Sequence, residues 1–415
     1  MAGSGAPPLQ RRLTVHAPGC LDPREAEPAG THHDPEDQRE AEPAVTHHDP
    51  EEPCEASEIM RVFGEARERG AKVFWLSGKI DKDREKVKAF STKNLEIMSN
   101  CDSFSDADIK EEVRRTHNVA WECRKGLKDS PNQDSFSVLI VEGEYAIYCV
   151  FDGHGPFGHD VSEFTRTKLV EYFLSRLRRP GSEIPRSFEE AFESMQAQLQ
   201  AMTTSHESST PRRRKESLDA NTSGSTVTMA YHSVKDHKLW IAHVGDSRGV
   251  LGVRHKGGVA STDMTIDHKP NLEAEKSRII ASGGRVIFDG YYNYRVFARD
   301  RPIPGLNMSR ALGDCLGHNE AGLSAQPDIR EVNLNDHEGE VVLLLCTDGV
   351  WEFVDSKDAM EMVMGPEDMQ KNLFRMSEVS YEKWMKDSDG EISDDITGIA
   401  VRLKRPGPTS PASPS

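Results

Sequence analysis

The sequence predicts an α+β fold in which strands and helices form a layered sandwich. Short apolar runs bounded by turn residues recur through the chain, which is typical of strands. A few long helical patterns interrupt these runs without alternating regularly with them, which favours a layered sandwich over a βαβ repeat. The expected strands span residues 137–141, 145–151, 226–232, 238–244, 249–253, 341–346 and 397–403, and the expected helices span residues 161–178, 188–202, 272–282 and 358–363.

Residues 1–56 form the first segment, and we expect them to be a disordered N-terminal tail. They are rich in Pro, Glu, Ala, Gly and His, so they bury too little apolar surface to offset the entropy of ordering. The tail contains a tandem repeat, because residues 24–36 recur with one change as residues 39–51, an offset of 15 residues. Its histidine pairs, His32/His33 and His47/His48, are candidate transition-metal ligands, although adjacent histidines on such a chain more often bind nothing specific.

Residues 57–104 are expected to be a helical segment that leads into the folded domain. A charged, helix-like stretch covers residues 57–69, and a short apolar run at 73–76 separates it from a second charged stretch. The domain itself is expected over residues 105–404. Within it, residues 203–221 are a predicted surface insertion with a basic run before Ser217, which is either a solvated loop or a phosphorylation site. Residues 405–415, rich in Pro and Ser, are an expected disordered tail.

Charge and cysteine content exclude several classes of protein. The chain has 52 basic and 69 acidic residues, which gives a net charge of −17. Nucleic acids and anionic membranes bind basic surfaces, so this charge argues against both as partners. No apolar run approaches the ~18 residues of a membrane span. There is no signal-peptide core and no glycine directly after Met1 for myristoylation. The seven scattered cysteines contain no C-x-x-C pair, so we expect a reducing location, cytoplasmic or nuclear, with Cys149 and Cys346 as core residues.

The residues with catalytic chemistry lie at strand ends. Five predicted strands begin or end next to an aspartate: Asp134, Asp152, Asp246, Asp348 and Asp394. One such acid is an ordinary turn residue, but several at one sheet edge would repel each other unless cations neutralise them. Oxygen ligands suit Mg²⁺ or Mn²⁺ better than zinc. Two ions sharing one carboxylate would bridge a water and lower its pKa, which would generate a hydroxide for attack on phosphorus.

Eight motifs in fixed order carry a resemblance to a known family. They are Asn132-Gln-Asp-Ser, Val150-Phe-Asp-Gly-His-Gly, Ser223-Gly-Ser-Thr, Val244-Gly-Asp-Ser-Arg, Asp267-His-Lys-Pro, Gly305-Leu-Asn-Met-Ser-Arg-Ala-Leu-Gly-Asp, Thr347-Asp-Gly-Val-Trp and Asp394-Asp-Ile-Thr. This set resembles the metal-dependent protein phosphatases of type 2C over residues 105–404. The resemblance implies a sandwich of two antiparallel sheets flanked by helices. It also implies a monomeric enzyme that hydrolyses phosphoserine and phosphothreonine in proteins by attack of a metal-bridged water.

The resemblance further implies a role for each site residue. Asp152 should bridge two metal ions, with the Gly153 carbonyl on one of them. Asp348 and Asp394 should complete the shell of the other ion, while Asp134 should hold a metal-bound water and Asp246 a weaker third ion. His154 matches the general acid that protonates the leaving serine or threonine oxygen, a plausible role for an imidazolium near neutral pH. Residues 284–314 should form a mobile flap beside the cleft, anchored by Arg310 and Asp314.

Two positions depart from the family pattern. Gln133 stands where many members have a glutamate that contributes to the metal site. Asp129 occupies the spacing of a basic residue that clamps the phosphate, so Lys128 or Arg124 would have to serve, and a lysine offers only a point charge. These departures keep open an alternative, a pseudophosphatase that binds phosphoproteins without turnover, and a third reading, a phosphatase of small molecules, also remains.

Overall fold

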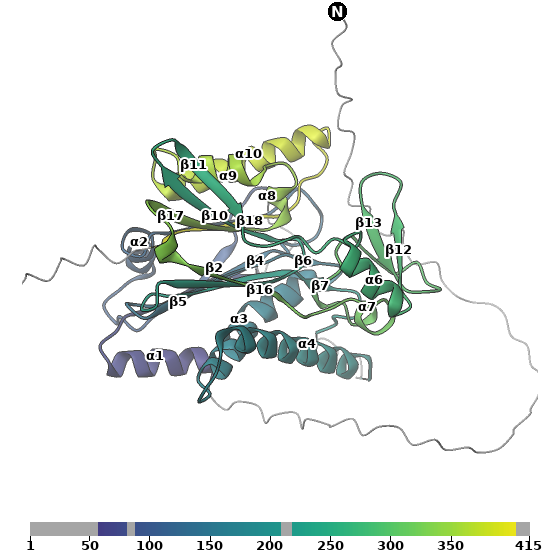
Figure 1. The fold of residues 1–415 in the computed structure, drawn as a ribbon, viewed down its shortest axis with the longest axis horizontal. Helices are drawn as coiled ribbons and strands as arrows, with labels where there is room; N and C mark the ends of the chain where they lie inside the picture. The colour runs from purple at the N-terminus through teal and green to yellow at the C-terminus, as the bar shows by residue number, and fades with distance from the viewer. Residues whose placement is uncertain (1–56, 81–87, 209–217, 404–415) are drawn as a thin grey trace, which may run out of the picture.

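The computed structural model describes residues 57–80, 88–208 and 218–403, and its centre is two antiparallel sheets packed face to face (Figure 1). The seven-stranded sheet has the order β16-β9-β8-β5-β4-β1-β2. Its strands are β1 (Val73–Lys79), β2 (Asn94–Ser99), β4 (Ser135–Val141), β5 (Tyr145–Phe151), β8 (Val227–Ser233), β9 (Lys238–Val244) and β16 (Asp328–Asn333). The five-stranded sheet has the order β11-β10-β17-β18-β3, from β3 (Val119–Arg124), β10 (Arg248–His255), β11 (Gly258–Asp263), β17 (Glu340–Cys346) and β18 (Ile396–Leu403).

The core lies in three layers. Between the sheets, one cluster joins side chains of both, including Phe136 and Tyr148 with Leu343 and Ile399. The outer face of the seven-stranded sheet packs against α1 (Glu58–Glu68), α3 (Gly158–Leu177) and α4 (Ile184–Ser208). The outer face of the five-stranded sheet packs against α8 (Asp348–Trp351), α9 (Ser356–Val363) and α10 (Met369–Asp387). The predicted sandwich of two antiparallel sheets flanked by helices is therefore confirmed.

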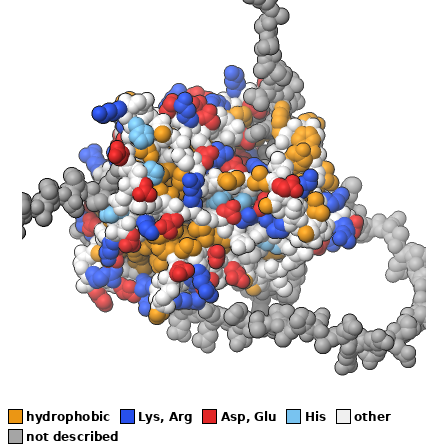
Figure 2. Space-filling view, viewed as in Figure 1, with side chains coloured by type: hydrophobic (Ala, Val, Ile, Leu, Met, Phe, Trp, Pro, Cys, Tyr) orange, Lys and Arg blue, Asp and Glu red, His pale blue; other side chains and the backbone are white. Residues whose placement is uncertain are grey.

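Smaller elements complete the described part of the fold. α2 (Asp106–Arg115) begins at a capping box in which Ser105 and Asp108 exchange hydrogen bonds. A short three-stranded sheet joins β6 (Gly153–His154), β7 (Gly224–Ser225) and β15 (Leu312–Gly313). A second one, from β12 (Arg285–Phe288), β13 (Tyr294–Phe297) and β14 (Pro304–Leu306), lies beside α6 (Glu273–Ala281) and α7 (Cys315–Glu320). This second sheet lies within residues 284–314, the segment predicted to be the flap, and Figure 2 shows apolar side chains over its hairpin, where Ile287, Phe288, Tyr291 and Tyr294 are exposed.

The expected strands and helices all occur, but the segment 57–104 differs from its prediction. It begins with α1, as expected, and then contributes β1 and β2 to the large sheet, where β1 lies between β4 and β2. Its run Val73–Leu76 is buried on both faces, which suits an inner strand, whereas the charged residues around it suggested helix. The boundary expected at residue 105 is therefore not a structural division.

Other expectations have mixed outcomes. The two described ends of the predicted surface insertion 203–221 reach the core, because Thr203, Leu218 and Ala220 are buried. The tails 1–56 and 405–415, with the histidine pairs, and Ser217 lie outside the described residues. Cys149 and Cys346 are fully buried, as expected, and the five cysteines of the described part are free thiols. Among the described helices, none is long and apolar enough to cross a membrane.

Candidate active site

Five aspartates from five strand ends meet at one edge between the two sheets. Asp152 follows β5 and Asp246 lies two residues beyond β9, while Asp134 precedes β4. From the other sheet, Asp348 lies two residues after β17 and Asp394 lies two residues before β18. Burial raises the pKa of Asp152 well above its ordinary value, and the carboxylates of the other four raise it further. The structure thus brings together all five aspartates that the sequence singled out.

Asp152 and Asp348 lie at the centre of this cluster. Their side chains are close enough to share a hydrogen bond. Burial raises the pKa of Asp348 well above its ordinary value, and the nearby Asp394 and Asp246 add to the effect. Burial and the neighbouring Asp395 and Asp394 raise the pKa of Asp134 to about 7. Because these carboxylates repel one another at a site that is shielded from water, binding of cations there is strongly favoured.

Asp395 is a cluster residue whose separate role the sequence did not reveal. Its side chain is fully buried, and it accepts hydrogen bonds from the backbone N–H groups of Gly126 at 2.7 Å and Gln133 at 2.8 Å. It therefore fixes the loop before β4 against the start of β18. The adjacent Asp394 is left to face the cluster.

Two lysines contact the cluster. The Lys128 ammonium lies 2.5 Å from Asp394 and 2.9 Å from Asp395. Burial lowers the pKa of Lys128, but these two carboxylates raise it well above its ordinary value overall. The Lys269 ammonium lies 2.5 Å from Asp246. Lys269 belongs to the Asp267-His-Lys-Pro motif, so the sequence contained the signal, but not the partner.

The two other residues considered for the phosphate clamp lie differently. Arg124 is held by Glu122 at 2.7 Å, and its guanidinium lies over the rings of Phe90 and Phe374. Arg124 is therefore engaged by β3 and its neighbours, whereas Lys128 contacts the aspartate cluster. Asp129, which has the spacing of the clamp, is exposed.

His154 is placed by the short sheet β6-β7-β15. Its Nε2 lies 2.6 Å from Oδ2 of Asp314, whose side chain is fully buried. Burial lowers the pKa of His154, but Asp314 more than offsets this, so the net shift is upward. Asp314 was expected to anchor the flap, whereas its side chain orients the catalytic candidate His154. Gly224 lies against this pair, since a Cβ there would come within 2.2 Å of Asp314 Oδ2 and 2.7 Å of His154 Nε2.

Gly153 and Gln133 shape the loop beside Asp152. A Cβ at Gly153 would come within 2.3 Å of the Gly158 carbonyl oxygen and 2.5 Å of the Gln133 carbonyl oxygen, so no side chain fits. The Gln133 side-chain amide donates to the Gly155 carbonyl at 2.7 Å. The Gln133 side chain therefore holds the loop that follows Asp152 in place.

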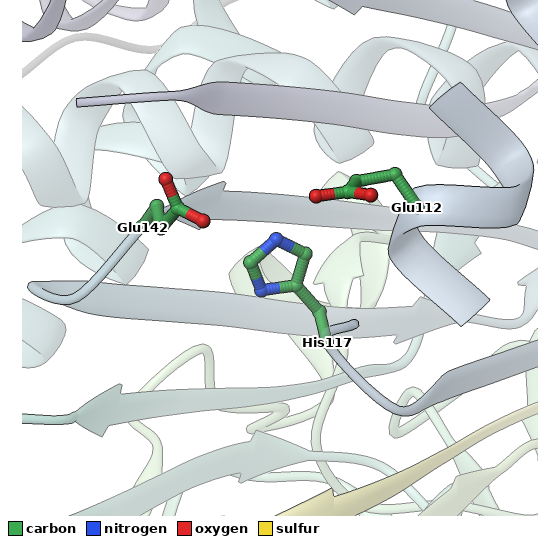
Figure 3. A group of neighbouring side chains, drawn as sticks. All are labelled: Glu112, His117 and Glu142. Atoms are coloured by element: carbon green, nitrogen blue, oxygen red, sulfur yellow. The ribbon is translucent and has the colours of Figure 1, made fainter. Parts of the chain in front are cut away.

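The residues present fit hard divalent cations. All candidate ligands are oxygens, and Oδ1 of Asp246 is buried with no hydrogen-bond partner within the described residues. A separate group, Glu112, His117 and Glu142, also has ligand-type atoms within 4.8 Å of one another (Figure 3). It lies at the other end of β4 from Asp134, because Glu142 directly follows that strand. The Lys72 ammonium stands 3.1 Å from Glu112 and 3.9 Å from Glu142. That lysine already offsets half of the charge of the two carboxylates, so the aspartate cluster is the better metal site.

Arg310 links the end of the predicted flap segment to α6 and β16. It forms a two-pronged ion pair with Glu275 of α6 and a 2.8 Å contact with Asp328 of β16. Glu275 also pairs with Arg278, and these contacts lower the pKa of Glu275 to about 2 despite its burial. The chain after the flap then runs through β15 to Asp314, so the flap and the His154 contact belong to one continuous segment.

Comparison with known proteins assigns the family. The family model "Protein phosphatase 2C" matches residues 109–384. A relative from Oryza sativa subsp. japonica, "Probable protein phosphatase 2C 48", is 32% identical over 318 residues, which cover 68% of this chain and 83% of the relative. This chain belongs to the protein phosphatase 2C family. A second relative, "Probable protein phosphatase 2C 73" from Arabidopsis thaliana, is 29% identical over 356 residues and covers 76% of this chain and 92% of its own length.

Solved structures support the same fold. The crystal structure of a serine-threonine phosphatase 2C from Toxoplasma gondii matches with a TM-score of 0.55 at 22% identity, covering 69% of this chain and 94% of that one. A C. elegans sex determining protein matches with a TM-score of 0.54 at 22% identity, covering 69% of this chain and 64% of that one. As a protein phosphatase 2C, the chain is a metal-dependent serine/threonine phosphatase, a hydrolase.

Proposed function

We propose that this protein phosphatase 2C holds two Mg²⁺ or Mn²⁺ ions in the strand-end cluster and hydrolyses phosphoserine and phosphothreonine in proteins by direct attack of water. Asp152, Asp348, Asp394 and the Gly153 carbonyl are the proposed ligands of the pair, with Asp134 holding water beside it. Asp246 is the proposed ligand of a third ion. When bound, such ions lower the pKa of water and polarise the phosphoryl group.

The observation that carries this proposal is the environment of Asp152. It is half-buried, and four other aspartates raise its pKa, so the apo site keeps a concentration of negative charge that Lys128 and Lys269 offset only in part. Proteins retain such clusters where divalent cations neutralise them. Carboxylate and carbonyl oxygens, with no cysteine or histidine among the proposed ligands, favour Mg²⁺ or Mn²⁺.

Lys128 and His154 are the proposed catalytic residues. Lys128 has three N–H donors, and its two carboxylate contacts leave one for a phosphate oxygen. The Nε2 of His154 contacts Asp314, and Nδ1, which is buried beside the backbone of Asp152, is the nitrogen proposed for proton transfer to the leaving oxygen. Asp314 keeps the ring in one orientation and stabilises its charged form, the arrangement of an acid held by a buried carboxylate.

A phosphopeptide assay tests the proposal. The purified protein should release phosphate from a phosphoserine peptide with Mn²⁺, and EDTA should abolish this turnover. Asp152→Ala should remove activity while circular dichroism shows an intact fold. The matched control is Asp263→Ala, which removes an exposed aspartate at the end of β11 and should leave turnover unchanged. Peptide binding without turnover in the wild type would contradict the proposal and identify a pseudophosphatase.

Location and assembly remain predictions. The free thiols of the described cysteines support a reducing location, cytoplasmic or nuclear. We expect a monomer, which light scattering coupled to size exclusion would measure directly.

A further inference from the structure

A pocket of about 500 Å³ lies at the outer edge of the seven-stranded sheet, where the first turns of α4 meet β16. We call it the β16 pocket. Figure 1 shows α4 beneath this edge of the sheet. The residues that line the pocket are Pro185, Glu189, Trp240, Pro327, Asp328, Ile329 and Glu331.

The β16 strand gives this pocket an open backbone edge. β16 is the first strand of its sheet, and among the described residues it pairs only with β9. An edge strand presents unpaired N–H and C=O groups, which an extended peptide can use by adding as a further strand. Ile329 packs against the helix-side core, and Glu331 stands opposite Trp240 in register. The pocket therefore lies on the helix-covered side of an edge that is open to an extended chain.

The chemistry of the lining selects a positively charged side chain. Three of the seven lining residues are carboxylates, Glu189, Asp328 and Glu331, and none is Lys or Arg. Lys238 contacts Glu331, and Arg310 contacts Asp328, both from outside the lining. The carboxylate side chains of Glu331 and Asp328 nevertheless remain 46% and 53% exposed. Prolines and Trp240 form the apolar walls. An arginine or lysine combines an apolar stem with a charged end and so matches both parts of this surface.

The β16 pocket is close to the catalytic cluster. Asp328 pairs in register with His243 of β9, and Asp246 follows three residues later, a span of about 10 Å along an extended chain. The consecutive residues His268 and Lys269 also connect the pocket to the cluster. His268 lies 3.3 Å from Asp328 of the pocket, and Lys269 lies 2.5 Å from Asp246 of the cluster. One substrate segment of a few residues is therefore long enough to reach from the cluster to the pocket.

We propose that the β16 pocket is a docking site for an extended, arginine- or lysine-containing segment of the phosphoprotein substrate. The proposal rests on the phosphatase function proposed above and adds a preference for substrates that carry basic residues near the phosphorylated residue. The net charge of −17 adds a long-range attraction for such segments.

A binding experiment without catalysis tests the pocket itself. Fluorescence anisotropy in EDTA would compare two unphosphorylated peptides that differ only in having three arginines or three glutamates. The arginine peptide should bind, and the glutamate peptide should not. Glu189→Lys should weaken arginine-peptide binding about tenfold, because it turns an attraction at the exposed start of α4 into a repulsion. The matched control is Glu361→Lys, the same change at an exposed position of α9 on the other side of the sandwich.

Kinetics then connect the pocket to turnover. A phosphoserine peptide with a basic arm should have a KM about tenfold higher in Glu189→Lys than in the wild type, with kcat unchanged. Hydrolysis of p-nitrophenyl phosphate, which has no arm, should be the same in both proteins. Equal binding of the two unphosphorylated peptides, or equal weakening by Glu361→Lys, would overturn the docking site. If the wild type did not hydrolyse p-nitrophenyl phosphate at all, the proposed phosphatase function would be overturned instead. Failure of the docking site and failure of the proposed function are therefore distinguishable.

Discussion

The substitution Asp314→Asn tests whether His154 acts as the general acid, independently of the proposed metal ligands. The change removes a buried carboxylate that lies 2.6 Å from the imidazole Nε2 and keeps the size of the side chain. A hydrogen bond to a charged group contributes about 1.5–3 kcal/mol. At about 1.4 kcal/mol for each tenfold change, a 10- to 150-fold loss of kcat on phosphoserine peptides follows, provided that the contact persists in the transition state.

The leaving group makes this prediction specific. A serine alkoxide needs a proton as it departs, whereas p-nitrophenolate is stable enough to leave without one. Asp314→Asn should therefore reduce kcat on the phosphopeptide and leave kcat on p-nitrophenyl phosphate nearly unchanged, both measured with saturating Mn²⁺. Asp328→Asn is the matched control, since it removes a carboxylate from another buried histidine, His268, and should not change the ratio of the two kcat values for a phosphopeptide that lacks a basic arm. Equal losses on both substrates would refute the reasoning.

Three further predictions follow from the same contacts. Gly224→Ala should reproduce the selective loss on phosphopeptides, because its Cβ would separate His154 from Asp314; a variant with unchanged phosphopeptide kinetics would show that the pair tolerates the intrusion. Asp152→Asn should abolish activity yet raise the Tm measured in EDTA, by about 2 °C for each kcal/mol of relieved repulsion; a lower Tm would mean that the carboxylate stabilises the apo fold. Burial lowers the pKa of His232 to about 4, so between pH 6.5 and 4 the unfolded chain binds a proton that the folded protein rejects. Stability is therefore complete above pH 6.5 and falls by up to about 3 kcal/mol toward pH 4. Urea unfolding at pH 7 and 5 should show this slope in the wild type and a flatter one in His232→Leu.

The parts of the fold that were predictable from sequence are those with strong local patterns. β17 is an uninterrupted apolar run, because it lies between β10 and β18 and is buried on both faces, and Asp348-Gly349 marks its end. α10 was missed because serines occupy two of its buried positions, Ser377 and Ser380, which weakens the apolar periodicity. β1 was missed because a four-residue apolar run between charged stretches does not distinguish strand from helix.

The candidate site was predictable as a set of acids but not as a set of contacts. Each aspartate follows or precedes its own strand, so the residue type and position are visible locally. Which of the adjacent Asp394 and Asp395 faces the cluster depends on the loop 126–133, far away in sequence. The partnership of His154 with Asp314 joins residues 160 positions apart, and it depends on the pairing of β6, β7 and β15, strands too short to give a periodic signal.

The position of β18 limits when the enzyme can become active. This strand is the last in the described chain, yet it lies between β17 and β3, and Asp394 and Asp395 stand directly before it. During synthesis, the growing polypeptide therefore lacks both an inner strand and two site carboxylates until residues 394–403 have left the ribosome. A variant that ends before residue 394 should therefore have no phosphatase activity.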